Sequence, residues 1–341
     1  MNYTLLKSDD FRKKLSDKID KYLSLSEHNS LTIGIYKNGR LYLFGTDGSD
    51  ALLYDIGSVT KTITAHLILK LAGEGLLDIN ETVDKYLPLK RGHYPTLYQL
   101  LTHTAGYRNL TPIEITALPL ISHGYARKNP YERCTKMTVI SCLERRRFRK
   151  PRVRYGYSDF ASAVLATVAE EVTGTPFAVL FEDFIHNDLG LTETVIEPSG
   201  EVRNPPAAQG ERLLPFWKWR RDNPYIAGGG IVSTIGDVLK YVTLQIEGDK
   251  PYITAAHKVC NESEVKGSNH LMCIGWHTYK KSNQLWHVGG VGTFRSSIIV
   301  NKHSRLGVAV LGNAKGRASA NVHYIAKMLY SELKTHRIKL K

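Results

Sequence analysis

Ser58 and Lys61 stand three apart at the start of an apolar-patterned run that ends near Leu71. If this run is a helix, the hydroxyl and the amine lie on one face of its first turn. A serine hydroxyl is a weak nucleophile until its proton is removed, and a lysine whose charged form is disfavoured by burial can remove it. The helix N-terminus would direct backbone N–H groups at a developing oxyanion. The pair therefore predicts nucleophilic catalysis by Ser58 with Lys61 as its base.

The same spacing recurs at Ser263 with Lys266 and at Ser331 with Lys334. A chain of this length contains roughly one or two such strings by chance, so the spacing alone selects none of the three. Gly57 precedes the first pair, a long amphipathic helix is predicted after it, and two further motifs follow downstream. This context favours Ser58.

Tyr157 lies in the second motif, residues 155–159, immediately ahead of a helix predicted from Phe160 to Val172. A tyrosine beside a lysine can serve as a phenolate base or proton shuttle if that cation lowers its pKa. The alternative is a tyrosine that only precedes a helix, because the chain has 19 tyrosines. Asp159 closes this motif.

Residues 286–294 form the third motif, in which His287 is followed by Gly289 and Gly290. Glycines allow backbone to approach a ligand closely, and an edge strand can offer an N–H group to an oxyanion. The spacing does not complete a G-x-G-x-x-G phosphate loop ahead of a helix, so that interpretation is dismissed. Alone, His287 would be a structural or surface histidine.

The elements that must position these motifs follow from periodicity and turn residues. Asn38 and Gly39 predict a tight hairpin between two short strands, and Gly73 and Gly75 end the helix after Ser58. The predicted helices are residues 8–24, 62–71, 97–101, 160–172 and 318–333, and the predicted strands are residues 31–36, 41–44, 274–279, 284–287, 294–300 and 306–311.

Strands at both ends of the chain around a helix-rich middle predict an α/β (α+β) fold. One antiparallel sheet would form from both chain ends, flanked by helices, with a helical lobe inserted. We expect a single domain over residues 1–341, with a sheet lobe at about 8–57 and 266–335 and a helical lobe at about 58–265.

The composition, 42% hydrophobic and 23% charged, is typical of a globular chain with a sizeable core. The net charge of +14 invites a nucleic-acid partner, but no recognition helix or aromatic RNA-binding pattern accompanies the basic run 145–154. Nucleic acid is therefore disfavoured. The run is read as a solvated loop, or as a source of positive field near Tyr157 that attracts acidic substrates.

No stretch approaches the ~20 apolar residues that a membrane span needs. The first ten residues lack a basic region followed by an apolar core, so we expect a cytoplasmic location unless an export signal is missing from the sequence. Cys134, Cys142, Cys260 and Cys273 show no zinc-like grouping, which favours free thiols in a reducing compartment.

Taken in order, the three motifs resemble those of the serine β-lactamase and penicillin-binding-protein superfamily. They are most similar to its class C β-lactamase-type branch, which includes D-alanyl-D-alanine carboxypeptidases, D-aminopeptidases and carboxylesterases. That branch carries Ser-x-x-Lys, then Tyr-x-Asn, then Lys-Thr-Gly or His-x-Gly. The resemblance covers roughly residues 15–333, with supporting matches at 100–106, 188–194 and 227–234.

The resemblance implies roles for these residues. Ser58 would attack an acyl carbonyl, Lys61 and Tyr157 would pass protons to the leaving group, and the N–H groups of Ser58 and Gly290 would form the oxyanion hole. Water activated by the same pair would hydrolyse the acyl-enzyme. The implied substrate is a small ester, amide or peptide, and no metal or cofactor is implied.

Two residues depart from the branch. Asp159 replaces its asparagine, and an ionised carboxylate near Lys61 would raise the lysine pKa and leave more of the proton transfer to Tyr157. His287 replaces the lysine that helps to hold a substrate carboxylate, and histidine is largely neutral near pH 7. We therefore expect poor penicillin turnover and favour an esterase or peptidase.

Two other functions stay open, a catalytically weak binding or sensory protein and an acyltransferase. Loops such as 107–135 and 200–225 would set the substrate specificity. In the second loop Trp217, Trp219 and Arg220 line a pocket or cap the core, and we favour the core.

Overall fold

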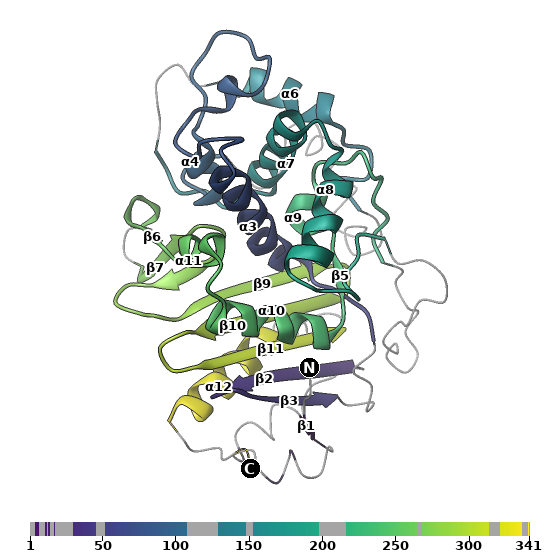
Figure 1. The fold of residues 1–341 in the computed structure, drawn as a ribbon, viewed down its shortest axis with the longest axis vertical. Helices are drawn as coiled ribbons and strands as arrows, with labels where there is room; N and C mark the ends of the chain where they lie inside the picture. The colour runs from purple at the N-terminus through teal and green to yellow at the C-terminus, as the bar shows by residue number, and fades with distance from the viewer. Residues whose placement is uncertain are drawn as a thin grey trace.

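The computed structural model describes residues 4–6, 11, 13, 17, 30–45, 52–107, 129–147, 153–197, 216–264, 268–313, 321–335 and 340. Its main feature is a nine-stranded sheet, which occupies the lower half of the molecule in Figure 1. The strands are β1 Thr4–Leu5, β2 Ser30–Lys37, β3 Arg40–Gly45, β6 Val259–Cys260, β7 His270–Cys273, β8 His277–Tyr279, β9 Leu285–Val291, β10 Phe294–Asn301 and β11 Leu306–Asn313. They lie in the order β1-β3-β2-β11-β10-β9-β8-β7-β6. The predicted fold class is confirmed.

The N-terminal hairpin joins the C-terminal strands in the middle of this sheet. β2 and β3 are connected through Asn38 and Gly39, whose φ angles of 49° and 86° lie in the left-handed region that such a tight turn requires. On its other side β2 pairs antiparallel with β11, and Thr32 lies opposite Leu311. The sheet is therefore formed from both ends of the chain, as predicted.

Helices cover both faces of the sheet. Along β11, Val308 and Val310 pack into one hydrophobic cluster with helix α12 (Asn321–Lys334), and Ala309 and Leu311 pack into a second cluster with helix α10 (Ile235–Glu247). Close approach of α10 depends on Gly307, because a Cβ there would collide with the side chain of Val242. Figure 1 shows α10 in front of the strands and α12 behind them.

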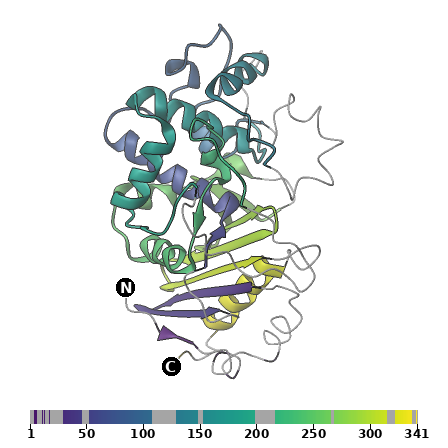
Figure 2. The same cartoon turned by 90° about the vertical axis from the view of Figure 1, so that its right-hand side faces the viewer.

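The remaining helices form a lobe above one end of the sheet (Figures 1 and 2). They are the 3-10 turn η1 Gly57–Val59, α3 Thr60–Gly73, η2 Val83–Lys85, α4 Leu97–Leu101, α6 Lys136–Arg145, α7 Asp159–Thr173, α8 Phe177–Asp183, the π-turn η4 Phe184–Asp188, α9 Ile226–Gly229, α11 Pro251–Ala256 and η5 Asn261–Ser263. A short pair, β4 Tyr54–Asp55 with β5 Val232–Ser233, leads into η1.

Helix α3 lies at the centre of this lobe and packs against α7, α9 and α11. Its side chains are buried from Thr60 to Leu69 on every face, so the predicted amphipathic helix is instead an enclosed one. Neighbouring α4 begins with a capping box in which the Thr96 and Gln99 side chains each bond the other's backbone N–H group.

Some sequence predictions differ from the structure. Residues 274–276 form the turn between β7 and β8. Only the second half of the strand predicted over 274–279 is therefore a strand, namely β8. Strand β6 belongs to the sheet although it lies before the predicted lobe boundary at residue 266. The helix predicted over 8–24 lies almost entirely outside the described residues, as do 148–152 of the basic run, 108–128 and 198–215.

Among the described residues, no single helix is long and apolar enough to cross a membrane; Asp159–Thr173 and Phe177–Asp188 meet that test only together, as a pair bent by 88°. All four cysteines are buried, and none forms a disulfide. The cytoplasmic location stays a prediction.

Candidate active site

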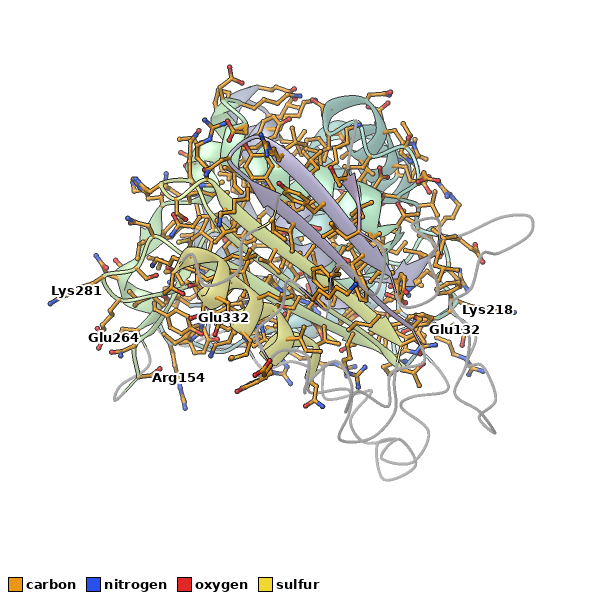
Figure 3. The ribbon with its side chains drawn as sticks, turned by 90° about the horizontal axis from the view of Figure 1, so that it is seen from below. Glu132, Arg154, Lys218, Glu264, Lys281 and Glu332 are labelled. Carbon is orange, nitrogen blue, oxygen red and sulfur yellow. The ribbon has the colours of Figure 1, made fainter. Side chains whose placement is uncertain are left out.

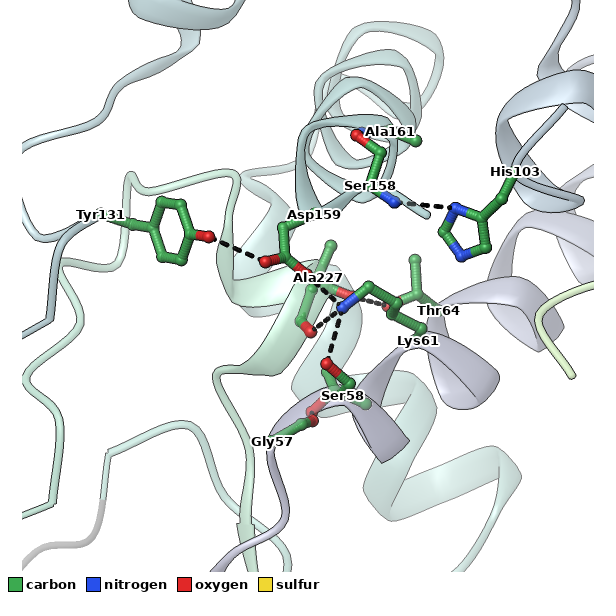
Figure 4. Close-up of polar contacts among 12 residues, drawn as sticks. Gly57, Ser58, Lys61, Thr64, His103, Tyr131, Ser158, Asp159, Ala161 and Ala227 are labelled. Atoms are coloured by element: carbon green, nitrogen blue, oxygen red, sulfur yellow. Dashed lines mark hydrogen bonds and ion pairs between the residues drawn. The ribbon is translucent and has the colours of Figure 1, made fainter. Parts of the chain in front are cut away.

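Ser58 and Lys61 lie side by side where η1 meets α3 (Figure 4). Ser58 belongs to the 3-10 turn just ahead of α3 and not, as predicted, to the first turn of that helix. Lys61 Nζ donates to Ser58 Oγ at 3.0 Å and to the Gly228 carbonyl oxygen at 2.6 Å. Only 3% of the Lys61 side chain is exposed. The structure thus brings the predicted nucleophile and the lysine into direct contact.

The backbone that presents Ser58 is fixed by its neighbours. Gly57 has a φ of 50°, a conformation that side chains rarely tolerate. Its N–H group donates to Asp55 Oδ1 at 3.2 Å, and its carbonyl accepts from Thr60 Oγ1 at 2.6 Å. Burial raises the pKa of Asp55 well above its usual range, although the Gly57 N–H group opposes this. These bonds hold η1 in one geometry.

Asp159 completes the surroundings of Lys61. Its Oδ1 atom lies 2.5 Å from Lys61 Nζ, and its Oδ2 atom accepts from the Tyr131 hydroxyl at 2.8 Å (Figure 4). The three protons of an ammonium therefore have acceptors in Asp159, Gly228 and Ser58. Burial lowers the pKa of Lys61, but Asp159 and Tyr157 outweigh burial and raise it above its ordinary value. Lys61 is accordingly charged near neutral pH.

Tyr157 faces the same lysine. The Lys61 Nζ atom lies 5.1 Å from the centre of the Tyr157 ring. Ser158 caps α7 by accepting from the Ala161 N–H group at 3.2 Å, which fixes Tyr157 immediately before the helix. Burial raises the pKa of Tyr157, and the opposing effects of Lys61 and of hydrogen bonds with Ser58 and Lys61 do not reverse this. Tyr157 is thus a neutral phenol, so the lowered pKa that the sequence analysis set as the condition for a phenolate base is not found.

Gly289 and Gly290 bring strand β9 against η1. A Cβ on Gly57 would lie 2.6 Å from the Gly290 nitrogen, and a Cβ on Gly289 would collide with the Ile56 carbonyl oxygen. Ser296 Oγ donates to that same carbonyl at 2.7 Å and ties β10 to the turn. Pairing of β8 with β9 ends at Trp286, so β9 beyond this residue has no strand beside it on that side among the described residues. The N–H groups of Ser58 and Gly290 consequently belong to adjacent backbones.

His287 is fully buried on β9 and does not line either of the cavities described below. Its Nδ1 atom donates to the Val288 carbonyl at 2.9 Å, and among the described residues Nε2 has no hydrogen-bond partner. Burial, with a contribution from Lys61, lowers the pKa of His287 to about 3. His287 is therefore neutral, as expected from the sequence, and its ring packs beside that of Tyr157, with ring centres 6.3 Å apart.

Two cavities meet at Ser58 and Gly290. The larger, about 850 Å³, is lined by Tyr157 and by aromatic and imidazole rings of the sheet side. The smaller, about 30 Å³, is bordered by Asp159 and by rings that include Trp217 and Trp219. Both tryptophans are buried, so they line a cavity and close the core at once.

The other two Ser-x-x-Lys serines lie elsewhere. Ser263 is buried in η5 and donates to the Cys260 carbonyl, and Ser331 is exposed on α12. Arg220 is also exposed, in an ion pair with Asp222. Within the described part of the chain, no group of three or more histidine, cysteine or acidic side chains could hold a metal ion.

A family profile described as Beta-lactamase matches residues 15–331. The chain belongs to the beta-lactamase family. Protein flp of Staphylococcus aureus strain N315 is 23% identical over 94% of this family member and 66% of its own length. The D-alanyl-D-alanine-carboxypeptidase/endopeptidase AmpH of Escherichia coli K12 is 27% identical over 57% of the chain and 49% of its own length. The chain thus spans about half to two thirds of the length of these curated relatives.

Solved structures show the same fold. The octameric penicillin-binding protein homologue from Pyrococcus abyssi superposes with a TM-score of 0.76 at 24% identity, covering 95% of this chain and 77% of that one. A beta-lactamase/D-alanine carboxypeptidase from Yersinia pestis has a TM-score of 0.75 at 19% identity, with 95% and 96% covered. The fold and family are therefore ones that contain serine hydrolases.

Three residues of this beta-lactamase-family site had no predicted role. Gly228 supplies a carbonyl to Lys61, Tyr131 holds Asp159, and His103 accepts from the Ser158 N–H group through Nδ1 at 3.3 Å. The His103 ring also lies 4.6 Å from that of Tyr157. Gly228 and His103 belong to stretches noted only as supporting matches, and no signal in the sequence marks Tyr131.

Proposed function

We propose that this chain is a serine hydrolase that cleaves an ester or amide through an acyl-enzyme on Ser58. The observation that supports this most is the 3.0 Å contact between Ser58 Oγ and Lys61 Nζ at the junction of two cavities. A hydroxyl at such a junction can meet a carbonyl carbon whose two substituents extend in different directions.

Acylation begins with attack of Ser58 Oγ on the carbonyl carbon. The carbonyl oxygen becomes an oxyanion, which the N–H groups of Ser58 and Gly290 stabilise. Because Lys61 is charged and Tyr157 is a neutral phenol, we assign the proton transfer to Tyr157: it accepts the serine proton while it gives its own proton to the leaving atom. The ammonium of Lys61 stabilises negative charge on the phenol oxygen during this exchange.

Deacylation reverses the same exchange. A water molecule attacks the ester carbonyl of the acyl-enzyme, its proton passes to Tyr157, and Tyr157 returns a proton to Ser58 Oγ as the acid is released. Each proton that leaves an oxygen is replaced within the cycle, so the side chains end in their starting states.

The ion pair between Lys61 and Asp159 favours a second candidate, a catalytically weak binding or sensory protein. A carboxylate 2.5 Å from the lysine stabilises its charged form and makes it a poor base. An acyltransferase uses the same acyl-enzyme, with an alcohol or amine in place of water.

The test is the intact mass of the folded protein after exposure to a fluorophosphonate. We expect one adduct on the wild type and none on Ser58→Ala. Ser331→Ala is the matched control, because this exposed serine has the same spacing to a lysine, and it should keep the adduct. A folded wild type without an adduct would make the binding or sensory function the leading one.

A further inference from the structure

We propose that the substrate of this site pairs a short acyl group, about the size of acetyl, with a leaving group that carries an aromatic ring system. The inference rests on the proposed Ser58 acyl-enzyme and goes further, because it assigns each half of the substrate to one of the two cavities.

The position of Tyr157 decides which cavity takes which half. Tyr157 lines the larger cavity and is absent from the lining of the smaller one, whereas Ser58 and Gly290 border both. The leaving atom must lie within hydrogen-bond reach of the group that protonates it. The leaving group therefore extends into the larger cavity, and the acyl substituent extends toward Asp159.

The two cavities are lined by segments whose neighbouring residues lie on different sides of the molecule. Tyr279 and His277 belong to β8, which runs directly into the turn that holds Lys281, and Trp217 and Trp219 flank Lys218. Figure 3 shows Lys281 and Glu264 at one side and Lys218 and Glu132 at the other. The two substituents of a carbonyl carbon bound at Ser58 therefore extend in different directions, one into each cavity.

The acyl side is small and its walls are fixed. Its volume of about 30 Å³ is far smaller than the 850 Å³ of the other cavity. Tyr131 stacks on Tyr225 with ring centres 4.4 Å apart, and on Trp219 at 6.4 Å. Asn223 Nδ2 donates to the Tyr131 carbonyl at 2.6 Å and Asn129 Nδ2 to the Lys218 carbonyl at 2.9 Å, which ties both segments to the core. An acetyl methyl fits such a slot, and a peptidyl or long fatty acyl chain does not.

The leaving-group side is large and built from flat rings. His277 stacks on Trp286 with ring centres 4.4 Å apart and an interplanar angle of 18°, and Tyr279 stacks on Trp286 at 5.7 Å. His270 Nε2 lies 2.7 Å from His277 Nδ1, and His323 Nδ1 lies 2.9 Å from Ser297 Oγ. A volume of about 850 Å³ with these walls accommodates an aromatic ring system in offset or edge contact.

The imidazoles of this cavity act as neutral aromatic surfaces. Burial lowers the pKa of His270, of His277 and of His323, the last to about 4. Arg295, across the β9–β10 pair from Gly290, also lines the cavity. Uncharged rings with one guanidinium among the lining residues favour a neutral or anionic leaving group over a cationic one.

The experiment measures kcat/KM for two matched ester series. Phenyl acetate, butanoate and hexanoate vary the acyl group alone, and phenyl and 2-naphthyl acetate vary the leaving group at similar phenol acidity. We expect acetate to exceed hexanoate by at least about tenfold. We expect 2-naphthyl acetate to exceed phenyl acetate by about tenfold, because a second ring is buried.

Two variants separate the cavities. Trp219→Leu enlarges the acyl slot and should reduce the acetate preference without changing the naphthyl preference. Tyr279→Ala should reduce the naphthyl preference without changing the acetate preference. Its control is Tyr324→Ala, because Tyr324 is exposed and does not line the cavity. If Trp219→Leu does not fold, Trp217→Phe replaces it. The fluorophosphonate adduct on Ser58 is recorded for every protein.

This inference is overturned if the wild type hydrolyses the hexanoate as fast as the acetate. It is also overturned if a variant in one cavity changes the preference assigned to the other. In either case an adduct on Ser58 still supports the proposed function. Acyl adducts are also sought by intact mass, so esters that acylate without turnover still report the preference. A folded wild type with neither adduct nor turnover overturns both proposals.

Discussion

The Nζ atom of Lys61 lies 2.5 Å from Oδ1 of Asp159. A carboxylate at this position changes what the lysine can do, because the pair stabilises the ammonium and leaves little neutral amine near pH 7. A neutral lysine could accept the serine proton itself. With the ammonium favoured, Lys61 stabilises charge and Tyr157 accepts the proton.

The first prediction concerns Asp159→Asn. Removing the carboxylate lowers the pKa of Lys61, so more neutral amine is present at a given pH. Because the proposed mechanism uses the ammonium of Lys61, kcat/KM should begin to fall at a lower pH in the variant than in the wild type. The measurement is a pH–rate profile of both proteins, with Tyr131→Phe as a control that retains the carboxylate. An unchanged profile would remove Asp159 from the mechanism.

Tyr157→Phe should lower kcat by about 10²–10⁴-fold, because it removes the proposed proton relay and keeps the ring. Tyr155→Phe is the matched variant: its residue lies two positions earlier and lines the same cavity. We expect it to change kcat by less than about tenfold. Equal losses in the two variants would contradict the role given to Tyr157.

Two neighbouring glycines should respond differently to alanine. In Gly289→Ala the new Cβ collides with the Ile56 carbonyl oxygen and Ser296 Oγ, so strand and turn must separate. In Gly290→Ala it meets the flexible Arg295 side chain at 3.4 Å. Urea unfolding should show a loss of about 2 kcal/mol or more for the first variant and less than about 1 kcal/mol for the second. Similar losses would show that the contact between β9 and η1 is not tight.

Stability should fall as the pH drops below about 6.5. Burial lowers the pKa of His66 and His287 to about 3 and of His257 and His323 to about 4, so the unfolded chain binds more protons between these values and 6.5. Each such histidine adds a slope of about 1.4 kcal/mol per pH unit.

Urea unfolding at pH 7, 6 and 5 measures this slope. His66→Asn should make this slope shallower by the contribution of about one proton. A pH-independent free energy of unfolding over this range would contradict the prediction.

Local signals were sufficient for much of the fold. Asn38 and Gly39 specify the hairpin because few residues accept positive φ, and Thr96 with Gln99 starts α4 at its capping box. The apolar run 306–311 predicted β11 but not which helices cover its two faces. The short strands β6 and β7 were not predicted, because two to four residues are too few to show a periodic pattern.

For the site, motif order selected Ser58 over Ser263 and Ser331, and of these three serines the structure puts only Ser58 beside Lys61 and beside Tyr157 of the second motif. The pKa of Tyr157 could not be predicted, since burial outweighs the nearby cation and burial depends on distant segments. Tyr131 reaches Asp159 from a segment whose position only the tertiary fold determines.

The pairing of β2 with β11 has a consequence for how the protein is made. Thr32 and Leu311 are opposite one another at the centre of the sheet, but a ribosome adding ~5–20 residues per second takes tens of seconds to pass from one to the other. During this interval the hairpin β2–β3 exposes an unpaired strand edge, which invites association with other chains. Nascent chains stalled before β11 should therefore depend on chaperones more strongly than the finished protein.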